Sequence, residues 1–211
     1  MALKIKYPDH ITLLRGKHED STINRICGLG EECSIRLGEN INEISSVFSQ
    51  INNFFDCLPL AAAVQDKFLL VHSGIGSIDN LLEIKEVVRP VKVRNSQTVM
   101  DLLWSGTKDE KRLNYESKKC SEEEMDAFLD ANCLEMLVNT RDGLTNGVEE
   151  DSSSVSIFSV SNYANTNNKG GILKINKNLS VVPYLLNSSP SKRANWVGNV
   201  SMKSSLAFSS V

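Results

Sequence analysis

The chain has 211 residues, of which 41% are hydrophobic and 23% are charged, as expected for a globular protein of one medium domain or slightly more. Its formal net charge of −3 gives no attraction to nucleic acid or another polyanion, and its apolar runs are too short to span a bilayer. We therefore expect no nucleic-acid or membrane partner.

The N-terminus and the cysteines favour a protein of the cytoplasm or nucleus. Two lysines near the N-terminus are not followed by an apolar signal core, so no secretory signal is predicted. The five cysteines are scattered, and no pair has the C-x-x-C spacing of a zinc knuckle or a redox motif. Reduced intracellular thiols are the expected state.

The first half of the chain mixes helical and strand patterns. Apolar residues three and four positions apart predict helices, and short apolar runs beside turn residues predict strands. In chain order, the expected elements are a strand at 10–14, helices at 19–37 and 43–56, paired strands at 60–63 and 68–71, and short helices at 78–84 and 98–104.

The second half ends in strands. Ser121, followed by three glutamates, predicts a helix N-terminus, and 134–138 predicts a strand. Runs at 155–160, 171–175 and 179–185, separated by Asn- and Gly-rich turns, predict an antiparallel meander. We expect a layered α/β (α+β) domain over residues 1–186 and a disordered Ser/Asn-rich tail over 187–211.

The most informative stretch is Leu14-Arg15-Gly16-Lys17-His18-Glu19, which follows the first predicted strand. In α/β folds, sites lie at the carboxyl ends of strands. The stretch resembles the Leu-Arg-Gly-Asn-His-Glu signature of the phosphoprotein phosphatases, which are two-metal serine/threonine phosphatases. Lys17 stands where that family has a metal-ligating Asn, and a charged ammonium cannot ligate a cation.

Three further segments resemble the same family in the same order: Val71–Gly76, Met100–Ser105 and Ile157–Tyr163. The resemblance implies a calcineurin-like metallophosphoesterase fold, a layered β-sandwich flanked by helices. Residues 2–8 and 165–173 are similar to the plant kelch-repeat phosphatases of the brassinosteroid-signalling type, although no kelch repeat is present.

The family's reaction, as the resemblance implies it, uses two divalent metals (Mn, Fe or Zn) to generate a hydroxide that hydrolyses phosphoserine or phosphothreonine. The family takes its first ligands from Gly-Asp-x-His-Gly and Gly-Asp-x-Val-Asp-Arg-Gly, which precede the signature by more residues than lie before Leu14. We therefore expect a truncated copy that lacks the N-terminal strands. Its unpaired sheet edge would favour hetero- or homo-association or poor solubility.

Five positions carry the implied site. His72 matches a metal ligand, or is a strand-end histidine bonded to backbone; His18 matches the general acid, or is a turn histidine without a catalytic partner. Asn139 replaces a phosphate-gripping arginine and Arg141 a metal-ligating histidine, or both belong to an ordinary polar loop. Tyr163 matches a tyrosine beside the metals, or is a packed ring.

Three readings follow. Of the implied metal ligands only His72 remains, so the leading one is a catalytically degenerate phosphatase domain. The second is a residual phosphatase that recruits metal differently or is completed by a partner chain. The third is a metal-free phosphoprotein-binding module that uses Lys17 and Arg141, because both are natural phosphate partners. A gene copy without selected activity also stays open.

Overall fold

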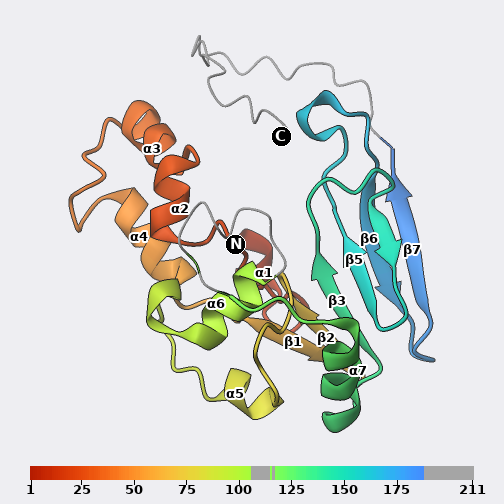
Figure 1. Cartoon of the computed structure of the whole chain (residues 1–211). Helices are drawn as coiled ribbons and strands as arrows, with labels where there is room; N and C mark the ends of the chain where they lie inside the picture. The colour runs from red at the N-terminus through yellow and green to blue at the C-terminus, as the bar shows by residue number, and fades with distance from the viewer. Residues whose placement is uncertain (106–114, 116, 188–211) are drawn as a thin grey trace.

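A mixed five-stranded sheet is the centre of the molecule (Figure 1). The computed structural model describes residues 1–105, 115 and 117–187. The strand order in the sheet is β1-β2-β3-β5-β4. The strands are β1 (Ala61–Val64), β2 (Phe68–Val71), β3 (Met136–Thr140), β4 (Val148–Glu150) and β5 (Ser154–Ile157).

The inner strands of this sheet run in the same direction. β1 and β2 form the expected antiparallel hairpin, and its turn holds Gln65 and Asp66 at φ of 52°. β2 pairs in parallel with β3, and β3 pairs in parallel with β5. The carboxyl ends of β2, β3 and β5 therefore meet at one edge of the sheet, where α/β proteins usually carry their sites.

The helix predicted over 19–37 is two helices. α2 (Ser21–Ile26) and α3 (Leu29–Leu37) are separated by Gly28, whose φ of 107° interrupts the helical backbone. The helix predicted over 43–56 is confirmed, in a shorter form, as α4 (Val47–Phe55). Gly28 takes a conformation that residues with a Cβ rarely adopt, which explains the break.

The helices on the connection from β2 to β3 cover the sheet. They are α5 (Leu81–Lys85), α6 (Gln97–Trp104) and α7 (Glu122–Ala131). As predicted, Ser121 caps α7, in a reciprocal capping box with Glu124. Leu102 and Leu103 of α6 are fully buried in the core cluster that also contains Leu137 of β3. Because α6 packs here, the segment after β2 runs directly over its C-terminal end.

The strand predicted at 10–14 needs correction. Residues 11–16 do not form the expected strand: the Arg15 N–H donates to the Pro59 carbonyl at 2.8 Å, but no strand ladder follows. The chain instead begins with a short helix, α1 (Ala2–Lys6), and continues irregularly to α2. Apolar composition alone could not distinguish a buried loop from a strand here.

The predicted C-terminal meander is confirmed in part: its three strands form and the last two pair antiparallel, but the first lies in another sheet. β5 belongs to the five-stranded sheet, whereas β6 (Gly170–Ile175) and β7 (Val181–Leu186) pair only with each other among the described residues. β4, an edge strand with exposed glutamates, was not predicted from the sequence. Figure 1 shows the β6–β7 hairpin beside β5, on the opposite side of the molecule from α2–α4.

The β6–β7 hairpin exposes apolar side chains. Tyr184, Leu185 and Leu186 of β7 are 50%, 46% and 43% exposed. The association expected from the sequence stays a prediction, and almost all of the predicted tail, 188–211, lies outside the described residues. No helix in the described part of the chain is long and apolar enough to cross a membrane.

Three glycines join the two sheets. A Cβ built on Gly171 would overlap the carbonyl oxygen of Gly147, and one built on Gly147 would lie 2.6 Å from backbone atoms of Gly170 and Gly171. The Gly171 N–H donates to the Phe158 carbonyl at 2.8 Å, which continues the contact toward β5. The backbones at this junction are too close for any side chain.

We predict that Gly171→Ala destabilises the fold by about 3 kcal/mol in urea unfolding, because backbone must move to admit the methyl group. Gly143→Ala is the matched control. Gly143 has φ of 79° but nothing within 4 Å of an added Cβ, so only backbone strain of about 1 kcal/mol is expected. An equal or smaller loss at Gly171 would contradict the packing described here.

Candidate functional site

A cavity of about 680 Å³ lies at the carboxyl ends of the parallel strands. Its walls come from the loop before α2, the segment after β2, the end of β3 with the following turn, and β5. Lys17, His72, Asn139 and Arg141 all line it. Four positions singled out in the sequence, which come from three separate segments of the chain, therefore line one cavity.

Arg15 fixes the loop that carries Lys17. Its side chain is 1% exposed, and its guanidinium donates to the Asp56 carboxylate at 2.7 Å and to the Val91 carbonyl at 2.6 Å. A third hydrogen bond, 2.9 Å long, reaches the Glu19 carbonyl. Arg15 thereby connects three separate segments, and its loop can hold the next side chains in a defined place.

Lys17 brings a positive charge into the cavity. The residue is 8% exposed, and its Nζ donates to Oδ2 of Asp142 at 2.6 Å. The Asp142 side chain, in contrast, is 62% exposed. A buried ammonium needs a compensating anion, and Asp142 provides one from the turn after β3. Sequence reasoning did not single out Asp142, although it directly follows Arg141.

His72 is held by β3. The Thr140 N–H and hydroxyl donate to the His72 carbonyl at 2.9 and 2.8 Å, and the same hydroxyl lies 3.0 Å from Nδ1 of the ring. The pKa of His72 is lowered from 6.5 to about 4, mainly because the ring is buried and in part because of the nearby Lys17 charge, while Asp142 opposes the shift. The imidazole is therefore neutral at pH 7, and both roles stated above for His72 stay predictions.

Both polar atoms of the Asn139 amide make hydrogen bonds in a local network. Its Nδ2 donates to the Ser73 carbonyl at 2.7 Å, and its Oδ1 accepts the Ser156 hydroxyl at 2.7 Å. Asn139 and Ser156 are register partners in the β3–β5 ladder, so the strand pairing itself creates this contact. Asn139 ties the strand ends together.

The segment after β2 is held against α6. The Asp101 carboxylate, which is fully buried, accepts the Ser77 N–H at 2.9 Å. A Cβ on Gly76, whose φ is 58°, would overlap the Asp101 side chain, so glycine is required there. Asp101 of the Asp-Leu-Leu-Trp-Ser segment therefore has a structural role.

Ser105, at the end of α6, lines the cavity and was missed by sequence reasoning. Its residue is 6% exposed, and its Oγ is buried without a hydrogen-bond partner in the described structure. A Cβ on Gly74 would lie 2.7 Å from this Oγ. No sequence signal distinguishes a serine whose hydroxyl is left unpaired.

His18 and Tyr163 do not line this cavity. His18 is exposed, and no hydrogen bond to its ring is found among the described residues. Tyr163 is 51% exposed and packs edge-on against Phe158, with ring centroids 5.4 Å apart. Arg141 lies at the opening, where its guanidinium donates to the Glu149 carboxylate at 2.6 Å. The roles implied for His18 and Tyr163 stay predictions.

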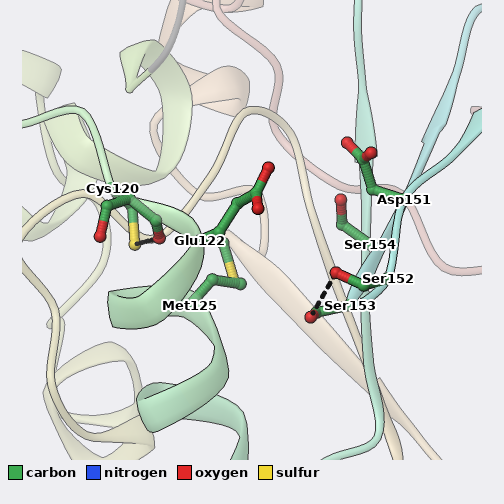
Figure 2. Close-up of a pocket in the computed structure, with 8 residues that line it drawn as sticks. Cys120, Glu122, Met125, Asp151, Ser152, Ser153 and Ser154 are labelled. Carbon is green, nitrogen blue, oxygen red and sulfur yellow. Dashed lines mark hydrogen bonds between the residues drawn. The ribbon is translucent and has the colours of Figure 1, made fainter.

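A smaller hollow of about 140 Å³ adjoins the cavity (Figure 2). Glu122 and Met125, from the start of α7, lie on one side, and Asp151 and Ser154, from the β4–β5 turn and β5, lie on the other. These four residues and Cys120 line both spaces. Lys17 therefore lines only the larger cavity, whereas the carboxylates of Glu122 and Asp151 line both spaces.

The donors present do not fit a two-metal centre. Among the described residues, no three His, Cys, Asp or Glu side chains lie close enough to hold a metal ion. The Asn139 amide is engaged, and the Asp142 carboxylate is ion-paired to Lys17. Two dications a few ångströms apart need several carboxylate, imidazole or amide ligands. Lys17 and Arg141, which line the cavity, instead carry cationic side chains.

Comparison with known proteins gives three matches. A family model described as calcineurin-like phosphoesterase matches residues 1–138. Serine/threonine-protein phosphatase BSL2 of Arabidopsis thaliana is 32% identical over 203 residues, which cover 90% of this chain and 20% of BSL2. A solved Saccharomyces cerevisiae serine/threonine phosphatase with similarity to human phosphatase PP5 superposes with a TM-score of 0.77 at 22% identity, covering 91% of this chain and 65% of that one.

These matches differ in what they support. At 22% identity the yeast structure establishes the fold alone, a mixed sheet with flanking helices. The chain spans only a fifth of the length of BSL2. The matching family model covers well over half of the chain and includes the Arg15 loop, the segment after β2 and most of β3.

We predict that Arg15→Met lowers the free energy of unfolding by about 3 kcal/mol, because the Asp56 carboxylate and two carbonyls lose a buried donor. Arg36→Met is the control: Arg36 is paired with Glu32 at 2.6 Å, but both side chains are more than half exposed, so a change within about 0.5 kcal/mol is expected. Urea unfolding measures both, and equal losses would contradict an anchoring role for Arg15.

The lowered pKa of His72 predicts a pH dependence of stability. The unfolded chain binds a proton near pH 6.5, whereas the folded chain resists it until about pH 4. Stability is therefore retained above pH 6.5 and lost as the pH falls toward 4, by about 2 kcal/mol between pH 7 and pH 5. His72→Gln should remove this component in urea unfolding at the two pH values. An unchanged pH dependence would show that His72 is already solvated.

Proposed function

The chain belongs to the calcineurin-like phosphoesterase family and contains a serine/threonine protein phosphatase-like domain, and from this premise we propose that it has lost the family's hydrolytic reaction. It keeps the fold and a cavity at the carboxyl ends of β2 and β3. In this proposal, the domain recognises a phosphoprotein or another protein partner in the cytoplasm or nucleus and does not dephosphorylate it.

The observation that carries the proposal is the position of the Lys17 ammonium. The resemblance assigns this position to an asparagine that ligates a metal. Lys17 is instead buried in the cavity wall and paired with Asp142 at 2.6 Å. A dication brought next to this ammonium would be repelled and would find three donors and no acceptor.

Two further substitutions support the same conclusion. Arg141 stands where the resemblance places a metal-ligating histidine, and its guanidinium offers only donors. Asn139 stands where it places a phosphate-gripping arginine, and its amide bridges Ser73 and Ser156. One neutral imidazole, His72, cannot hold two dications, and two-metal hydrolysis requires both to activate water and clamp the phosphoryl oxygens.

Protonation of the leaving group is also poorly supported. The resemblance assigns protonation of the leaving serine oxygen to His18. His18 is exposed, and the described residues give its ring no hydrogen-bond partner to orient it. An unoriented acid contributes little, because general acid catalysis depends on a fixed distance to the reacting oxygen.

We predict no turnover of a phosphoserine peptide by the purified chain in manganese, and substantially fewer than two metals per chain by elemental analysis. The double variant Lys17→Asn with Arg141→His introduces two side chains that can ligate a metal into the cavity that His72 also lines. This double variant should bind Mn²⁺ or Zn²⁺ measurably more tightly than the unmodified chain in calorimetry.

Two metals per chain with turnover that His72→Asn abolishes would overturn the proposal. Turnover that appears only when the chain is co-purified with another protein would instead favour a residual phosphatase completed by a partner. Equal metal binding by the double variant and the unmodified chain would show that Lys17 and Arg141 are not what prevents coordination.

A further inference from the structure

We infer that the cavity binds a phosphorylated peptide without any metal, with the phosphate on the Lys17 ammonium and a basic side chain of the same peptide between Glu122 and Asp151. This inference rests on the proposed loss of hydrolysis, since a hydrolysing site would release its ligand as product. On the protein side, all the groups that would contact the peptide are side chains of this chain.

The Lys17–Asp142 pair marks the position where the phosphate would bind. The Lys17 side chain is 10% exposed and fixed, whereas the Asp142 side chain is 62% exposed. Asp142 can therefore leave into water at small cost, while Lys17 cannot. A phosphate monoester carries up to two negative charges and three acceptor oxygens at neutral pH, so it competes well with a single carboxylate for the ammonium.

Ser105 is a second, independent observation in the same cavity. The residue belongs to the cavity lining, and the described residues provide no hydrogen-bond partner for its buried hydroxyl. Polar groups in such positions are normally satisfied, and a phosphate oxygen would accept this hydroxyl. Arg141 and the exposed Lys119 add positive charge to the lining. The Arg141 and Glu149 side chains are 61% and 50% exposed. Their ion pair is therefore weak, and a phosphate can replace Glu149 at small cost.

The smaller hollow is acidic, because Glu122 and Asp151 are the charged residues among the described residues that line it. Glu122 and Asp151 approach the smaller hollow from α7 and from the β4–β5 turn (Figure 2). Both residues also line the larger cavity. Inorganic phosphate can use only the lysine. A phosphoserine or phosphothreonine peptide with a neighbouring arginine or lysine matches both the lysine and the carboxylates, and this match identifies the class of ligand.

Fluorescence anisotropy with the full chain in excess EDTA tests this inference. Three labelled peptides are compared: phosphoserine flanked by arginines, the same peptide without phosphate, and phosphoserine flanked by glutamates. We expect saturable binding only with phosphate, and at least about fivefold tighter binding of the arginine peptide. Equal binding of the unphosphorylated peptide, or no binding at all, would overturn the inference.

Charge variants test the lysine and the carboxylates separately. Asp142→Asn should tighten phosphopeptide binding about fivefold, because it removes the competing carboxylate from an exposed position. Lys17→Gln should weaken binding tenfold or more, on the order of one charge-assisted hydrogen bond. Lys67→Gln is the control: it removes one charge from an exposed pair with Glu135 at 3.2 Å, away from the cavity lining, and should change nothing.

Glu122→Gln with Asp151→Asn should abolish the preference for arginine while the dependence on phosphate remains. Thermal melting of each variant confirms folding, and Asp142→Asn keeps the inference testable even if Lys17→Gln does not fold. No tightening by Asp142→Asn would overturn the displacement step. Manganese-dependent turnover in a parallel assay would contradict the proposed loss of hydrolysis, whereas the EDTA result tests binding alone.

Discussion

The cavity is organised around a buried ammonium that must be paired with an anion. Lys17 lies on a loop fixed by Arg15, and Asp142 lies on the turn after β3, so their 2.6 Å contact joins two segments more than a hundred residues apart. Removing a charge from water is costly unless a partner compensates it. The contact places the turn after β3 beside the loop before α2, and both residues of the pair line the cavity.

The parallel ladder determines what else surrounds that ammonium. Because β2, β3 and β5 run in the same direction, the residues at their carboxyl ends converge. Thr140 holds His72, and Asn139 bridges Ser73 and Ser156, so each strand end is bonded to its neighbour. In this structure, polar groups at the strand ends bond mainly to each other, which stabilises the edge of the sheet but leaves few of them available as metal ligands.

Local signals in the sequence were sufficient for elements whose ends carry strong chemical markers. Ser121 and the following glutamates predicted α7, and the apolar runs around Gln65–Lys67 predicted the β1–β2 hairpin, because capping and turn formation depend on near neighbours. The family motifs also identified residues that do converge, such as Lys17 and His72.

Features that depend on distant partners could not be predicted in the same way. The run at 10–14 has strand composition, but no neighbouring strand pairs with it in the described structure. β5 and β6 were assigned to one meander, because the sequence does not say that β5 pairs in parallel with β3. Asp142 looks like an ordinary turn residue until the fold brings it to Lys17, so its role was visible only in three dimensions.

Replacement of metal ligands by cationic side chains differs physically from simple loss of ligands. Replacing a ligand by alanine would leave an empty, uncharged space, whereas Lys17 and Arg141 keep positive charge in the cavity where a dication would otherwise supply it. An ammonium can donate hydrogen bonds to a phosphate, but it cannot lower the pKa of bound water or withdraw electrons from phosphorus as a Lewis acid. In the function proposed above, such a substitution would separate recognition from hydrolysis: a cationic side chain can still pair with a phosphate, whereas no metal-bound hydroxide would form to attack it.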